Sequence, residues 1–169
     1  IDYLKLTKDD RRLIANLGLV KDQYGISFCH TILNRAVRNK NCNLILQNLE
    51  TVISVIGRNE SFELIKRMFD VFQQEVKFFH LDSFSNVKIC LSLFPTLLRV
   101  FPRSRRLVRK LFKTAYKNSL NYTFFLIRDI EFTSNLYGAG FERFYRRIVS
   151  KLMNTKHVGL LCNQSDSIV

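Results

Sequence analysis

Apolar residues recur every three or four positions along most of this chain, which is the spacing of an amphipathic α-helix. The pattern is clearest over 60–80 and over 141–154, where phenylalanines mark one face of each segment. Further helices are expected over 7–17, 24–38, 42–56, 82–98 and 103–117. Pro95 should kink or split the helix over 82–98, because proline removes one backbone hydrogen bond from a helix interior.

The expected helices begin about twenty residues apart, a spacing typical of antiparallel helix pairs joined by short loops. The segment 120–136 also alternates as a strand would, but its helical neighbours favour a helix. We therefore predict an all-α fold of seven to eight helices, arranged as antiparallel pairs of the HEAT or armadillo kind or as a compact orthogonal bundle. Residues 1–155 are expected to form a single α-helical domain, and residues 156–169 a flexible C-terminal tail.

The stretch from Val100 to Lys117 combines a basic face with an apolar face and contains no acidic residue. On a helix, five of its cations share one narrow face, namely Arg103, Arg106, Lys110, Lys113 and Lys117. The opposite face carries Leu107, Val108, Leu111, Phe112, Ala115 and Tyr116. Pro102 suits the first turn of this helix, and Ser104 is placed to cap it. The last helix repeats the design, with Arg143, Arg146, Arg147 and Lys151 beside a stripe of Phe141, Phe144, Tyr145, Ile148 and Leu152.

The net charge of +13 is concentrated in the second half of the chain. Residues 1–84 carry 12 Lys and Arg against 10 Asp and Glu, whereas residues 85–169 carry 15 against 4. Such an asymmetric field indicates a polyanionic partner, because solubility alone would be served by a mixed surface.

The two basic helices supply the candidate binding residues. Arginine outnumbers lysine among them, and its planar guanidinium forms paired hydrogen bonds with phosphate. The expected partner is the backbone of RNA or DNA within a larger assembly, with Tyr116, Tyr122, Tyr137 and Tyr145 near enough to stack on bases if exposed. The candidate residues are Arg103, Arg105, Arg106, Arg109, Lys110, Lys113, Lys117, Arg143, Arg146, Arg147 and Lys151.

Other binding functions stay open at this point. The chain could be a helical scaffold or adaptor for an acidic protein partner, or its basic faces could dock on an anionic membrane surface. Four cysteines and three glycosylation sequons also allow a secreted, cytokine-like factor, although an intracellular protein is favoured. If the chain ends natively at Val169, the residues Ser167–Val169 match what a PDZ domain accepts.

No constellation of residues indicates an enzyme. His30, His80 and His157 lack metal-ligand spacing, and the four cysteines form no CxxC pair. The segment Gly138-Ala139-Gly140 precedes a helix but belongs to no complete phosphate-binding motif, so an interhelical turn is expected there. We therefore expect no catalytic residue, no metal and no cofactor. The apolar run Ile89–Leu98 is also far shorter than the ~20 residues of a membrane span.

Overall fold

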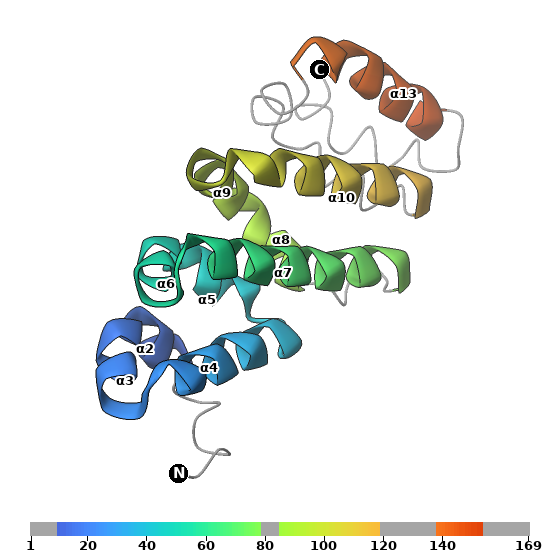
Figure 1. Cartoon of the computed structure of the whole chain (residues 1–169). Helices are drawn as coiled ribbons and strands as arrows, with labels where there is room; N and C mark the ends of the chain where they lie inside the picture. The colour runs from blue at the N-terminus through green and yellow to red at the C-terminus, as the bar shows by residue number, and fades with distance from the viewer. Residues whose placement is uncertain (1–9, 79–84, 119–137, 154–169) are drawn as a thin grey trace. The chain divides into compact units, whose positions relative to one another are not determined.

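The computed structural model describes residues 10–78, 85–118 and 138–153, and every element within these ranges is a helix (Figure 1). The all-α prediction is confirmed. The segment 120–136 and the tail 156–169 lie outside the described residues. None of the helices within the described ranges is both long and apolar enough to cross a lipid bilayer.

The chain divides into two compact units, which are described separately. Unit 1 comprises residues 1–72 and 85–104, and unit 2 comprises residues 73–84 and 105–169. The single domain over 1–155 stays a prediction.

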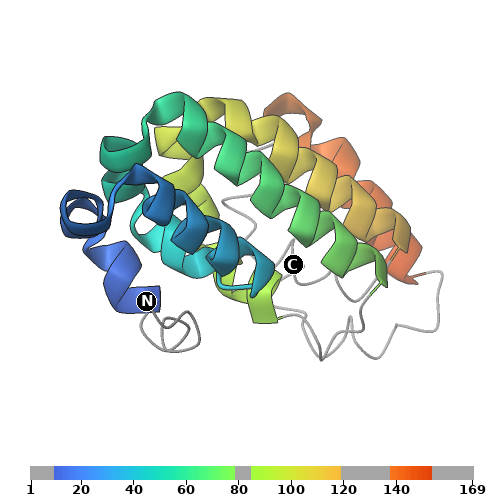
Figure 2. The same ribbon diagram turned by 60° about the horizontal axis from the view of Figure 1, so that its bottom comes forward.

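Unit 1 is built from short helices packed around a phenylalanine-rich core. Helix α3 (Leu17–Tyr24) packs on α4 (Ile26–Arg38) and α6 (Leu49–Ile56) (Figure 2). Helix α2 (Asp10–Ala15) packs on α4, and α5 (Cys42–Gln47) packs on α8 (Ser85–Cys90). Helix α7 continues for six residues into unit 2. The elements are α2 (Asp10–Ala15), α3 (Leu17–Tyr24), α4 (Ile26–Arg38), α5 (Cys42–Gln47), α6 (Leu49–Ile56), α7 (Arg58–Phe78), α8 (Ser85–Cys90), the 3-10 turn η2 (Leu91–Leu93), α9 (Phe94–Val100) and the 3-10 turn η3 (Pro102–Ser104).

Two asparagines separate consecutive helices of unit 1. The helix expected over 42–56 ends at Asn48, whose side-chain amide donates to the Leu44 carbonyl at 2.7 Å. Asn16 separates α2 from α3 in the same way, donating to the Arg12 carbonyl at 2.9 Å. Each amide bonds a carbonyl four residues earlier and so competes with the helical backbone, which bends the chain at that point.

Two other helix boundaries lie at a glycine and near a proline. The helix expected over 7–17 ends at Ala15, and α3, which covers residues up to Tyr24, was not predicted. The chain turns at Gly25, which has a φ of 93°, a conformation open to glycine at little steric cost. The predicted interruption at Pro95 is confirmed, because α8, η2 and α9 replace one continuous helix there.

Three phenylalanines form the centre of the unit 1 core. The rings of Phe69 and Phe72 lie 5.1 Å apart, and that of Phe94 lies 5.5 Å from the first and 6.1 Å from the second. All three are fully buried. In the same unit, Asp10 and Arg35 form a largely buried ion pair that joins α2 to α4. The attraction between the two charges offsets part of the desolvation cost of burying them.

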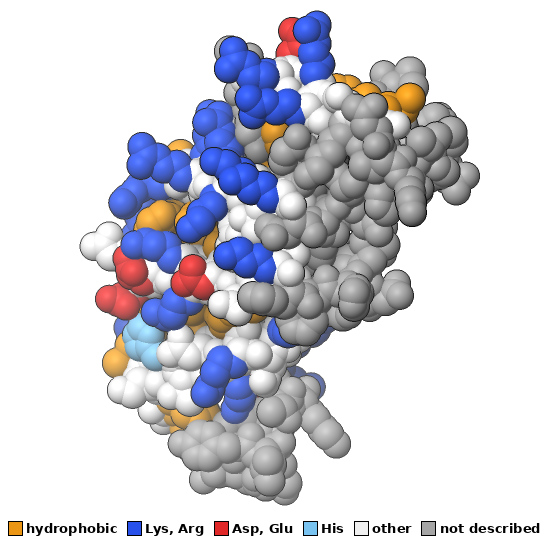
Figure 3. Space-filling view, turned by 90° about the vertical axis from the view of Figure 1, so that its right-hand side faces the viewer, with side chains coloured by type: hydrophobic (Ala, Val, Ile, Leu, Met, Phe, Trp, Pro, Cys, Tyr) orange, Lys and Arg blue, Asp and Glu red, His pale blue; other side chains and the backbone are white. Residues whose placement is uncertain are grey.

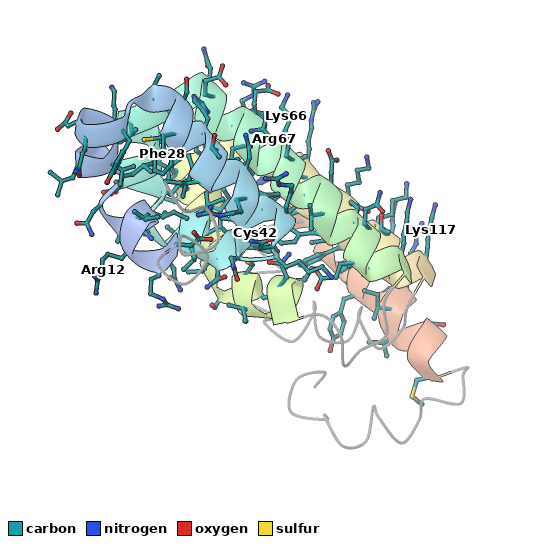
Figure 4. The ribbon with its side chains drawn as sticks, turned by 90° about the horizontal axis from the view of Figure 1, so that it is seen from below. Arg12, Phe28, Cys42, Lys66, Arg67 and Lys117 are labelled. Carbon is teal, nitrogen blue, oxygen red and sulfur yellow. The ribbon has the colours of Figure 1, made fainter. Side chains whose placement is uncertain are left out.

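Cys29, Cys42 and Cys90 are buried in α4, α5 and α8, and Figure 4 shows Cys42 among the helices while Arg12 points away from them. The Cys29 thiol donates to the Leu17 carbonyl at 3.7 Å, and burial raises its pKa above the ordinary value of 9.0. The folded state therefore holds this proton more tightly than the unfolded state does. The resulting stabilisation is complete below pH 9.0 and is lost as the pH rises through the raised pKa.

Alkylation of Cys29 is accordingly expected to be much slower in the folded protein than in the urea-unfolded chain, because the thiolate is the reacting form. The folded-state rate should continue to rise at pH values where the unfolded rate has levelled off. Peptide-resolved mass spectrometry after timed iodoacetamide treatment measures both rates. Equal folded and unfolded rates at pH 8 would contradict the burial of this thiol.

Candidate polyanion-binding surface

The described part of unit 2 brings the two predicted basic helices together. Helix α10 (Arg105–Asn118) buries its apolar face through Val108, Leu111, Phe112 and Ala115, as predicted. The 3-10 turn η4 (Gly138–Gly140) leads into α13 (Phe141–Met153). The ring of Phe144 on α13 stacks on that of Phe112 on α10, with centroids 6.3 Å apart and planes 23° apart. This ring pair joins the apolar sides of the two helices.

Six basic side chains line one hollow of about 550 Å³ between these elements, which we call the cationic hollow. Helix α10 contributes Arg109, Lys110, Lys113 and Lys117, and the other wall consists of Gly140, Arg143, Phe144 and Arg147. No acidic side chain is among these lining residues. Because its described lining carries six cations and no carboxylate, this part of unit 2 has a concentrated positive potential.

The lining cations are accessible to a ligand. Five of them are exposed, and Arg109 is half-buried. Figure 4 shows Lys117 at the end of α10, where its side chain points away from the ribbon. Lys and Arg side chains gather over α10 and α13 in the upper part of Figure 3. Six of the eleven predicted residues are thus brought together on one accessible surface of unit 2.

The other predicted residues of unit 2 lie outside the cationic hollow. Arg105 and Arg106 are exposed on the first turn of α10. Arg146 forms an ion pair with Glu142 one turn earlier on α13, and both side chains are more than 70% exposed. An exposed pair of this kind contributes little stability but lowers the charge that Arg146 offers to a ligand. Lys151 lies on the last turn of α13.

Arg103 belongs to unit 1, where it helps to line a smaller hollow of about 180 Å³. Its guanidinium lies 4.7 Å from the centre of the Phe62 ring, and that of Arg58 lies 4.5 Å from the centre of the Phe101 ring. Arg58 also donates to the Val100 carbonyl. These are cation–π contacts within the fold, and they give Arg103 a packing role.

A carboxylate stands close to this smaller hollow. Glu63 pairs with Lys66 at 2.8 Å, and the hydrogen bond from Lys66 lowers the pKa of Glu63. The Coulombic attraction of Lys66, Arg67 and Arg103 acts in the same direction. The arginine and lysine charge in this part of unit 1 is therefore partly balanced, in contrast to the cationic hollow.

Two lining residues of the cationic hollow were not predicted as site residues. Phe144 was assigned to the buried stripe of its helix, yet it is half-buried and contributes to the wall. Gly140 was expected to be part of a plain turn. Its place directly before a helix on a basic face was the only available indication of a role.

Of the tyrosines proposed for base stacking, Tyr145 has a described side chain, and it is not among the described lining residues of the cationic hollow. Tyr145 is half-buried on α13, and burial raises the pKa of its phenol. Tyr116 lies within α10, whereas Tyr122 and Tyr137 lie outside the described residues.

Within residues 10–78, 85–118 and 138–153, no group of three or more His, Cys, Asp or Glu side chains is arranged to hold a metal ion. His30 is half-buried on α4, and the other two histidines lie outside these ranges.

Comparison with family models, with curated proteins and with solved structures gives no significant match to this chain.

Proposed function

We propose that this protein is a non-enzymatic binding module that docks the cationic hollow onto the phosphate backbone of RNA or DNA. The observation that supports it is the convergence of six basic side chains from two helices on one accessible hollow whose described lining includes no acid. Three of these residues are arginines, whose guanidinium groups bind phosphate oxygens through paired hydrogen bonds.

The composition of the surface favours a nucleic acid over an acidic protein. Stable protein interfaces are centred on buried apolar or aromatic anchors surrounded by a polar rim. In the described part of unit 2 the exposed large apolar residue is Met153, and it is not among the described lining residues of the cationic hollow. A surface on which six of the eight described lining residues are cations gains much of its affinity by releasing counterions from a densely charged polymer.

Binding of a labelled oligonucleotide across a salt series tests this proposal. The logarithm of the binding constant should fall linearly with that of the salt concentration, by roughly 0.7–0.9 per phosphate contacted. Fluorescence anisotropy with a single strand, a duplex and polyglutamate of matched length compares the possible partners. Absence of nucleic-acid binding at low salt would refute the proposal. Tighter binding of polyglutamate would replace it with an acidic protein partner.

A further inference from the structure

The cationic hollow has an aromatic wall as well as charge. Phe144 is the one aromatic residue among the described lining residues, and half-burial leaves part of its side chain accessible. The ring rests on Phe112, which is 1% exposed and fixed in the interior of unit 2. Phe144 is therefore an apolar surface that Phe112 holds in place from behind and that cations surround.

From this arrangement we infer that the cationic hollow binds single-stranded nucleic acid, with one unpaired base against Phe144 and the flanking phosphates on the basic side chains. The inference rests on the proposed function and specifies its ligand. A strand with free bases offers both an apolar ring and a regular series of negative charges. Aromatic side chains and cationic grooves together are the usual means of binding such a strand.

The size of the hollow agrees with an inserted base. Its volume of about 550 Å³ lies within the range of roughly 300–1,000 Å³ that is usual for small-molecule sites. A duplex keeps its bases stacked and paired inside the helix, so it can present only its backbone to this surface. Entry of a base from a duplex would also cost a few kcal/mol of unstacking and unpairing.

The positions of the cations on α10 suit more than one phosphate. Lys110, Lys113 and Lys117 follow one another at intervals of three and four residues, so they lie along one side of the helix. From the first to the last, the helix rises by about 10 Å. This length covers about three nucleotide steps at the rise of about 3.4 Å per step in a stacked strand. Arg143 and Arg147 supply charge from the opposite wall.

The chain provides a direct spectroscopic test because it contains no tryptophan. The Phe144→Trp variant carries a single tryptophan in the wall of the hollow, and stacking of a base on it should quench its emission. Phe62→Trp is the matched control, because Phe62 is a half-buried phenylalanine of unit 1 that packs on another ring at 5.7 Å. The ligands are an oligothymidylate and an abasic strand with the same number of phosphates.

We expect the oligothymidylate to quench the emission of Phe144→Trp, and the abasic strand to leave it unchanged. Neither strand should alter the emission of Phe62→Trp. The wild-type protein should bind oligothymidylate about tenfold more tightly than the abasic strand, in line with the value of one stacked base. Phe144→Leu should remove this preference, and Phe144→Tyr should retain it.

Equal wild-type affinities for the two strands would overturn the single-strand inference and leave the phosphate-binding proposal intact. Quenching by both strands alike would also overturn it. Failure of both strands to bind at low salt would refute the proposed function itself. The wild-type comparison decides the question even if a substitution at position 144 prevents folding.

Discussion

Replacing Lys110 and Lys113 together by glutamate is expected to weaken binding of a single-stranded oligonucleotide by about 100-fold or more at physiological salt. Both side chains are exposed in the wall of the cationic hollow. A hydrogen bond to a charged group contributes about 1.5–3 kcal/mol, and about 1.4 kcal/mol corresponds to a tenfold change in affinity. Reversal also places a negative charge beside the phosphate, which adds to the loss.

The matched control reverses the same amount of charge on the same helix. Arg105→Glu combined with Arg106→Glu alters two exposed cations that lie outside the cationic hollow. We expect this variant to lose less than about tenfold in affinity, because exposed charges at a distance are screened by salt. Anisotropy titrations give both values, and circular dichroism verifies that each variant keeps its helices. Equal losses in the two variants would show that the affinity comes from the overall positive charge of the protein and not from contacts in the cationic hollow.

The affinity of the variant with glutamate at positions 110 and 113 should also depend less on salt concentration. Two fewer phosphate contacts reduce the slope of the logarithmic plot by roughly 1.4 for a single strand. The control variant should keep the wild-type slope. This second measurement separates lost contacts from a uniform change in affinity.

Phe94→Ala is expected to lower the free energy of unfolding by about 3–5 kcal/mol, which is typical for removal of a buried aromatic ring. The side chain is fully buried and contacts the rings of Phe69 and Phe72. The cavity left behind cannot close completely, because interiors are packed as densely as organic crystals. Urea denaturation followed by circular dichroism measures the loss.

Leu93→Ala is the control for this second prediction. Leu93 precedes Phe94 in the chain and is half-buried, so its truncation should cost well under half as much. If Phe94→Ala lost no more stability than Leu93→Ala, the three phenylalanines would not form the centre of the unit 1 core.

The helical class and the two basic faces could be predicted because they depend on local patterns. Apolar residues at helical spacing define a buried face wherever the helix packs, as Val108 and Leu111 show. The basic face of α10 was equally clear, because the stretch 100–117 has no acid that would neutralise it. Such features can be predicted without knowing which helix packs against them.

The other features depend on tertiary contacts or on competing hydrogen bonds. Asn48 divides a helix through a side-chain bond that apolar periodicity does not report. Phe144 fits the apolar stripe of α13, but only its contact with Phe112 shows that the ring forms a wall of the hollow. Arg103 shares a face with Lys110 in the sequence pattern, yet its contact with Phe62 assigns it to another hollow. Periodicity gives the direction of a side chain and leaves its neighbours undetermined.

The crowding of six cations around one hollow has a consequence for the stability of unit 2. Like charges on α10 and α13 repel one another across the hollow. We expect a bound anion to reduce this repulsion and to stabilise the packing of the two helices by mass action. The melting temperature of unit 2 should then rise when a polyanion is added.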